Sequence, residues 1–336
     1  MKRLIPFLFL GFVLVFVPII GSQPFAAPYY EGKVLTIIVG YPAGGGYDMI
    51  ARVLAKHLPK YIPGRPAVIV QNMPGASSMI AANHIYSKVK PDGLTLFGTA
   101  RNLAFMQLLK ADGVRYDMRK FSWIGSAAAE TIVLCIRTTL PIKTVQDLLN
   151  SKDPIYLGVT GPADITTQVT QISKDYFPGF NAKIVEYHGA PEVWLAIERK
   201  ECDGVWIAYN SGRSYIDKGL VRPLVRARVS QRGIENLPVN EDLATDPTGK
   251  TIMAMLGRTG AMGRLYLAPP GTPAEIMNIL REAFDKALSN PELQAETEKA
   301  RLELKYVSDV ECLKLLDYMF NQPPDVLKVL DKYMKF

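Results

Sequence analysis

The sequence predicts an α/β fold arranged as two lobes with a cleft between them. Apolar runs of strand length alternate with amphipathic helical segments from Lys33 to about Tyr209, which is the pattern of an α/β protein. Without its first 26 residues the chain keeps about 310 residues, more than one hydrophobic core usually serves. We therefore expect residues 27–126 and 252–336 to form lobe 1 and residues 127–251 to form lobe 2.

The N-terminus carries the pattern of an export signal. Lys2 and Arg3 precede an uncharged apolar segment, residues 4–20, and small residues follow it. We expect residues 1–26 to be a signal that is removed near Ala26, so that the mature chain lies in the periplasm. An uncleaved anchor is the alternative. No second apolar run in the sequence is long enough to cross a membrane.

Charge and cysteine usage exclude several classes of function. The formal net charge is +7, and removing Lys2 and Arg3 from the 39 basic residues leaves 37 against 32 acidic ones, or +5. Like charges form no block, so nucleic acid is not an expected partner. The three cysteines and three histidines lack the spacing of a metal or redox site, and we expect no metal and no cofactor. A bridge between Cys135 and Cys202 remains open.

A glycine-rich loop follows the first predicted strand and opens a helix. Residues 34–39 form a β-branched apolar run, residues 42–46 interrupt it, and apolar residues then recur at helical spacing to Leu58. The unpaired first amides of such a helix attract an anion, which glycines allow to approach closely. The glycine spacing matches no nucleotide-binding motif. Asp48 either caps the helix or contacts a ligand.

A second loop repeats this arrangement. Residues 158–167, GVTGPADITT, contain a glycine turn, a helix start and the hydroxyls of Thr160, Thr166 and Thr167. Two such loops that face each other across a cleft would grip a carboxylate from both sides, and each hydrogen bond to a charged group is worth about 1.5–3 kcal/mol. The alternative is that both are ordinary turns between a strand and a helix.

No sequence motif indicates catalysis. The chain contains no G-x-S-x-G elbow, no H-E-x-x-H pair and no cysteine with a histidine partner nearby in sequence, so we do not expect an enzyme. Other polar and aromatic side chains stand at strand ends, where a cleft would form. They are Arg101 and Asn102 after one strand, Tyr187 and His188 after another, and Tyr209 after a third.

The order of these segments resembles one protein family. Its most specific parts are residues 42–48 (PAGGGYD), 72–76 (NMPGA), 91–93 (PDG) and 270–273 (PGTP). In this order and spacing they resemble the extracytoplasmic solute receptors of tripartite tricarboxylate transporters, the TctC-like or Bug proteins. The resemblance extends over nearly all of the mature chain.

The resemblance implies a type II-like periplasmic binding protein whose two lobes close on a small organic acid. It implies a membrane permease with a large and a small subunit as partners, and we expect the receptor itself to be a monomer. Ligand contacts would come from the two loops, from the strand end at residues 99–102 and from the turn at residues 187–190. The candidate ligand-binding residues are Tyr41, Ala43, Gly44, Gly45, Asp48, Arg101, Asn102, Thr160, Gly161, Thr166, Thr167, Tyr187, His188 and Tyr209.

The chain departs from the family pattern in two places. Residues 162–164 (PAD) stand where small residues are usual and add an acid to the second loop, and residues 239–264 lack the usual Pro-Thr-x-x-Glu segment. The first departure bears on how the second loop binds the carboxylate. The second departure bears on lobe closure or on docking to the permease. The expected function is a non-enzymatic receptor for a carboxylate. The alternative is a periplasmic sensor that reports its ligand to a signalling partner.

Overall fold

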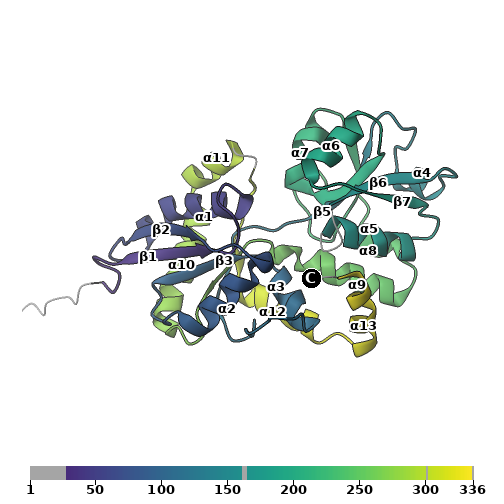
Figure 1. The fold of residues 1–336 in the computed structure, drawn as a ribbon. Helices are drawn as coiled ribbons and strands as arrows, with labels where there is room; N and C mark the ends of the chain where they lie inside the picture. The colour runs from purple at the N-terminus through teal and green to yellow at the C-terminus, as the bar shows by residue number, and fades with distance from the viewer. Residues whose placement is uncertain (1–27, 161–164, 300–301, 335–336) are drawn as a thin grey trace, which may run out of the picture.

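The computed structural model describes residues 28–160, 165–299 and 302–334. They form two lobes, each built around a mixed β-sheet (Figure 1), which confirms the predicted α/β architecture. The predicted export signal lies outside the described residues. Among the described residues, no helix has both the length and the apolar character needed to cross a membrane.

The sheet of lobe 1 has six strands in the order β11-β4-β10-β3-β1-β2. Their bounds are β1 (Val34–Val39), β2 (Ala67–Asn72), β3 (Thr95–Thr99), β4 (Ser122–Ser126), β10 (Leu265–Ala268) and β11 (Val307–Ser308). Strand β1 pairs in parallel with β2 and β3, whereas β10 is antiparallel to both β3 and β4. The helical segments of this lobe are α1 (Gly46–His57), η1 (Leu58–Tyr61), η2 (Ala76–Ser78), α2 (Met79–Lys88), α3 (Asn102–Leu108), α10 (Ala274–Leu288), α11 (Pro291–Lys299) and α12 (Asp309–Phe320).

The opening strand and helix form as their apolar periodicity predicts. Leu35 and Ile37 of β1 are fully buried and join Ile50 and Leu54 of α1 in one apolar cluster. The alternation along the strand and the helical spacing in α1 thus bury matching faces against each other. Because α1 begins at Gly46, its first amides open into the glycine-rich loop.

The sheet of lobe 2 has five strands in the order β7-β6-β8-β5-β9. Their bounds are β5 (Ile132–Arg137), β6 (Ile155–Val159), β7 (Ala182–Glu186), β8 (Gly204–Ala208) and β9 (Val221–Arg226). Helices α4 (Val145–Leu149), α5 (Ile165–Tyr176), α6 (Ala190–Glu198) and α7 (Tyr209–Asp217) connect them. Strand β6 is parallel to β7 and β8, and β5 is antiparallel to β8 and β9. Both sheets therefore contain three parallel strands followed by an antiparallel strand, which is followed by β4 and β11 in lobe 1 and by β9 in lobe 2.

Two segments that cross between the lobes lie side by side. Residues 127–131 join β4 to β5, and η3 (Thr259–Met262) leads back into β10. The N–H of Ala127 donates to the carbonyl oxygen of Arg264, and the N–H of Glu130 donates to that of Gly260, both at 2.8 Å. Each crossing is followed by a strand that enters the interior of a sheet, so both sheets depend on these paired segments.

The C-terminal helices connect the lobes once more. Helix α9 (Pro247–Arg258), which follows α8 (Asn240–Leu243), contacts α12 of lobe 1 and α5 of lobe 2. It also contacts α13 (Pro324–Tyr333), which lies beside it in Figure 1. The hydroxyl of Tyr333 donates to Oδ2 of Asp175 at 2.5 Å. One apolar cluster therefore extends from lobe 1 into lobe 2.

The three cysteines are buried and free. The bridge between Cys135 and Cys202 that the sequence left open is therefore not formed. Burial raises the pKa of the Cys312 thiol to about 12, so this side chain behaves as a small apolar group.

A side chain at Gly260 should separate the two crossing segments. A Cβ there would lie 2.3 Å from the carbonyl oxygen of Glu130. We expect Gly260→Ala to lower the free energy of unfolding by about 1–3 kcal/mol, as measured by urea denaturation. Gly189→Ala is the control, because its Cβ would meet only Cδ of Pro191, at 3.6 Å. Equal losses of stability in the two variants would contradict the conclusion that the close pairing of the crossing segments stabilises the fold.

Candidate functional site

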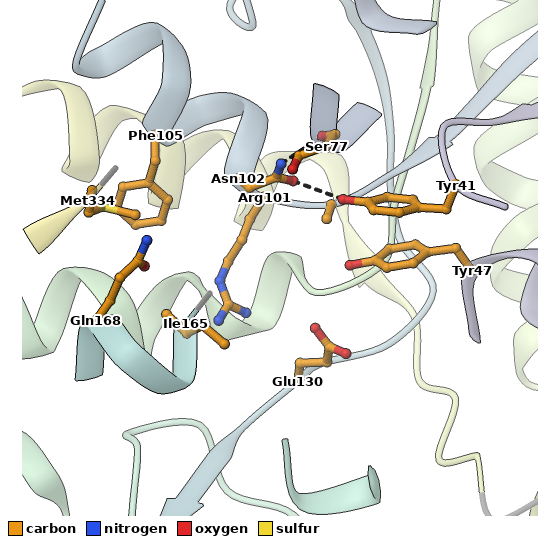
Figure 2. A pocket seen from close by; sticks show the side chains of 11 residues that line it. Tyr41, Tyr47, Ser77, Arg101, Asn102, Phe105, Glu130, Ile165, Gln168 and Met334 are labelled. Atoms are coloured by element: carbon orange, nitrogen blue, oxygen red, sulfur yellow. Dashed lines mark hydrogen bonds between the residues drawn. The ribbon is translucent and has the colours of Figure 1, made fainter. Parts of the chain in front are cut away.

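A cavity of about 300 Å³, which we call the inter-lobe cavity, takes its walls from both lobes. Lobe 1 contributes the loops after β1 and β2 and the start of α3, and lobe 2 contributes the start of α5 (Figure 2). The crossing segment and the end of α13 complete the wall. The lining residues are Tyr41, Tyr47, Ser77, Ala100, Arg101, Asn102, Phe105, Glu130, Ile165, Gln168 and Met334.

Arg101 brings an unpaired positive charge to this cavity. It precedes α3, and Figure 2 shows its side chain extending from that helix start toward Ile165 and Glu130. Its Nη1 atom is buried, and no described residue accepts a hydrogen bond from it. A buried guanidinium N–H without an acceptor costs free energy. An anionic acceptor that enters the cavity would remove this cost.

Hydrogen bonds fix the lobe 1 wall beside Arg101. The hydroxyl of Tyr41 donates to Oδ1 of Asn102 at 3.2 Å, and Nδ2 of Asn102 donates to the carbonyl oxygen of Ser77 at 2.8 Å. Burial raises the pKa of Tyr41 to about 12, so its hydroxyl keeps its proton at neutral pH. Residues from three separate loops are thereby held as one surface.

A second arginine near the cavity is neutralised by its neighbour. The rings of Tyr41 and Tyr47 stack with centroids 4.1 Å apart, and the Arg264 guanidinium lies 3.9 Å from the Tyr47 centroid. Arg264 Nη2 also pairs with Glu130 Oε1 at 2.5 Å. Because this pair carries no net charge, Arg101 alone leaves an excess positive charge among the described residues that line the cavity.

The loop after β2 holds strained backbone at the cavity wall. Ala76, Ser77 and Ser78 have φ angles of 43°, 49° and 80°, a left-handed region that side chains rarely adopt. Oγ of Ser78 lies 2.8 Å from Oγ1 of Thr99 in the interior. It fits only because residue 40 is glycine, whose Cβ would lie 1.6 Å from that Oγ. This packing holds Ser77 against the cavity.

The carboxylate of Asp48 is buried and accepts hydrogen bonds from neighbouring residues. Asp48 is 2 % exposed, and its Oδ2 accepts from the N–H of Gly44 (2.8 Å) and from Nε of Arg52 (2.9 Å). Its Oδ1 accepts from Nδ2 of Asn72 at 3.0 Å. The hydrogen bond from Arg52 is the main cause that lowers the pKa of Asp48 to about 2. Asp48 thus ties the glycine-rich loop to α1 and β2.

The other predicted residues of the first loop lie at its tip. Ala43, Gly44 and Gly45 are exposed and are not among the described residues that line the inter-lobe cavity. Gly46 lies close to the paired arginine, since a Cβ there would be 3.5 Å from Nη2 of Arg264. In this conformation the loop borders the cleft, and its tyrosines form the cavity wall.

The second loop contributes to a separate cavity of about 190 Å³, which we call the lobe 2 apolar cavity. It lies at the ends of β6 and β8, and is lined by Thr160, Ile165, Thr166, Ala190, Val193, Trp194, Val205, Ile207 and Ala208. Oγ1 of Thr160 and Oγ1 of Thr166 lie 3.3 Å apart. Thr167 is buried in α5, and Gly161 lies outside the described residues.

Three predicted residues lie apart from both cavities. The hydroxyl of buried Tyr209 donates to the carbonyl oxygen of Arg232 at 3.1 Å. His188 is exposed, and its backbone N–H donates to Oε2 of Glu192 at 3.1 Å. Tyr187 packs against an apolar cluster of lobe 2, where burial raises its pKa to about 12. Of the predicted set, Tyr41, Arg101 and Asn102 are brought together at the inter-lobe cavity.

Sequence reasoning missed several residues of the cavity wall. Tyr47 lies within the glycine-rich loop and Glu130 shortly before a predicted strand, and neither was among the candidate residues. Phe105 and Gln168 each lie about one helical turn beyond a strand-end loop, so helical periodicity could have placed them near the site. Met334 follows α13, and no local signal connects it with the cleft. Within the described part of the chain, no group of three or more His, Cys, Asp or Glu side chains is placed to hold a metal ion.

Known proteins match this chain in sequence. The model of the tripartite tricarboxylate transporter family receptor, TctC, matches residues 50–330. The UPF0065 protein in the gbd 5' region of Cupriavidus necator is 26% identical over 286 residues, which are 84% of this chain and 83% of that protein. Protein BugT of Bordetella pertussis is 36% identical over 88 residues, 26% of each protein.

Solved structures share the fold at low identity. A TctC solute binding protein from Polaromonas, without ligand, has a TM-score of 0.72 at 20% identity and covers 90% of this chain and 99% of its own. Rpa4515 of R. palustris with adipate has a TM-score of 0.64 at 20% identity, covering 90% and 98%. MatC of Rhodopseudomonas palustris with bound malate has a TM-score of 0.57 at 16% identity, covering 90% and 99%.

Stability should depend on pH through Asp48. Folding lowers the pKa of this carboxyl from 3.8 to about 2, so its contribution is present above about pH 4 and is lost as the pH falls toward 2. We expect Asp48→Asn to lower the free energy of unfolding by about 1–3 kcal/mol near pH 7 and by much less near pH 2.5, measured by urea denaturation. Asp112→Asn, in an exposed loop, is the control. A loss of equal size at both pH values would refute the assignment.

Proposed function

This chain belongs to the family of tripartite tricarboxylate transporter receptors, and we propose that it captures a small organic acid in the inter-lobe cavity. The family consists of solute-binding receptors, not enzymes. The proposed partners that receive the acid are the large and small subunits of a membrane permease. The proposed location is the periplasm, where the chain would act as a monomer after losing residues 1–26.

The observation that carries this proposal is the unpaired guanidinium of Arg101. Its buried Nη1 has no hydrogen-bond partner among the described residues, and a ligand carboxylate would supply an acceptor. A hydrogen bond between charged groups contributes about 1.5–3 kcal/mol. Guanidinium and carboxylate also match in geometry, because two parallel N–H donors can meet two oxygens.

Other groups of the cleft support an anionic guest. The first amides of α1, which begins at Gly46, favour negative charge. The acid nearest to them, Asp48, already accepts three hydrogen bonds from its neighbours, so the loop can still attract an anion. Two relatives of the same fold are described with carboxylate ligands, adipate and malate. We propose that the two lobes close on such an acid.

Removing the guanidinium should weaken acid binding. A screen of mono-, di- and aromatic carboxylates by thermal shift first identifies an acid that stabilises the protein. We expect Arg101→Gln to reduce its affinity by about 10- to 150-fold, as measured by calorimetry, because about 1.5–3 kcal/mol of interaction is lost. Arg101→Lys should retain part of the affinity, since a lysine keeps the charge but not the paired donors.

Arg115→Gln serves as the control, because Arg115 is an exposed arginine of the same lobe outside the cavity. Equal affinities of Arg101→Gln and the wild type would exclude Arg101 as the anchor. Stabilisation by sugars or cations, and by no acid, would exclude organic acids as the ligand class.

A further inference from the structure

We propose that the acid bound by this chain carries a single carboxylate and an apolar body, and that the body occupies the lobe 2 apolar cavity. The inference rests on the proposed function, because it concerns the same ligand. It specifies the ligand class as monocarboxylates with an aromatic ring or an alkyl chain, bound in preference to dicarboxylates.

The two cavities adjoin at one side chain. Ile165, the first residue of α5, lines both the inter-lobe cavity and the lobe 2 apolar cavity. Arg101 enters the inter-lobe cavity from lobe 1, and Figure 2 shows its guanidinium extending toward Ile165. A ligand whose carboxylate meets Arg101 can therefore place the rest of its body beside Ile165, toward lobe 2.

The inter-lobe cavity offers a counter-charge for one carboxylate. Arg101 has no ion-pair partner among the described residues, whereas the charge of Arg264 is cancelled by Glu130 at 2.5 Å. Any second carboxylate would have to meet a cation or free helix N-terminal amides elsewhere along the path of the ligand.

The described residues of the lobe 2 apolar cavity provide no such cation. Val193, Trp194, Val205 and Ile207 are each at least nine-tenths buried, and none of the described residues that line the cavity is charged. A carboxylate placed there would be buried without a partner, which is strongly unfavourable. Two helix starts line it, those of α5 and α6. The start of α6 already has its own acid in Glu192, which accepts from the backbone N–H of His188.

The size of the cavity fits a ring or a short chain. An apolar cavity of about 150 Å³ is large enough to bind benzene, and this one measures about 190 Å³. Trp194 supplies a flat wall, since its ring is stacked on that of Tyr215 at 3.9 Å and is thereby held in place. A phenyl group or an alkyl chain can fill this space, and the two threonine hydroxyls at its edge pair with each other.

Matched pairs of acids test the inference on the purified, ligand-free protein. Adipate differs from hexanoate by a carboxylate in place of a terminal methyl group, and 3-(4-carboxyphenyl)propionate differs from 3-phenylpropionate by one added carboxylate. We expect the monocarboxylate of each pair to bind at least about tenfold more tightly in calorimetry.

A cation placed in the cavity should reverse this preference. Ala208 lies at the end of β8 in the cavity wall, and Ala208→Lys should shift the affinity ratio at least about tenfold toward each dicarboxylate. Gln146→Lys adds the same charge on the exposed face of α4 in the same lobe and should leave the ratio unchanged.

If Ala208→Lys fails to fold, as judged by circular dichroism, Ala208→Phe fills the cavity instead and should weaken 3-phenylpropionate binding at least about tenfold.

The outcomes separate this inference from the proposed function. Wild-type protein that binds the dicarboxylates as tightly as their partners, with Arg101→Gln weakening both, would overturn the inference and leave the receptor function standing. Failure of every acid in the wider screen to bind would overturn the proposed function, and the inference with it.

Discussion

The paired crossing segments are the constraint on which both lobes and the cavity depend. The backbone of Glu130 bonds to Gly260, while its side chain pairs with Arg264, which in turn lies against the ring of Tyr47. One short stretch of chain therefore joins the two sheets, cancels a charge beside the ligand path and supports the aromatic wall. Gly260 has no side chain because the backbone of Glu130 occupies the place that its Cβ would take.

The charges of the site are divided between the lobes in a way that follows from burial. Lobe 1 supplies Arg101, whose buried Nη1 has no acceptor among the described residues. The acid of the same lobe, Asp48, accepts hydrogen bonds from Arg52 and from the loop amide of Gly44. Lobe 2 supplies apolar walls around Trp194. A ligand that spans the cleft thus meets a charged end and an apolar end, and closure of the lobes would remove both ends of the ligand from water.

The sequence predicted the elements of the fold better than it predicted the site. The strand-to-helix units, such as that from Val34 to His57, follow from local apolar periodicity. Arg101 and Asn102 were found because residues that follow interior strands share one edge of a sheet. Tyr209 follows the interior strand β8 and His188 the edge strand β7. The hydroxyl of Tyr209 bonds to the backbone of Arg232, and His188 is not among the described residues that line either cavity. Met334 reaches the cleft through tertiary packing of α13, which no local pattern reports.

The repeated sheet pattern also determines the order in which the lobes can form during synthesis. All five strands of lobe 2 lie within residues 132–226, so its sheet can be completed from one continuous stretch. Lobe 1 pairs Leu265 of β10 with Thr99 of β3, residues that are 166 positions apart, and such distant pairings form slowly because a long loop must close first. As the chain emerges from its N-terminus, all strands of lobe 2 are therefore present before lobe 1 has all of its own, and lobe 1 remains an open set of parallel strands until β10 has emerged.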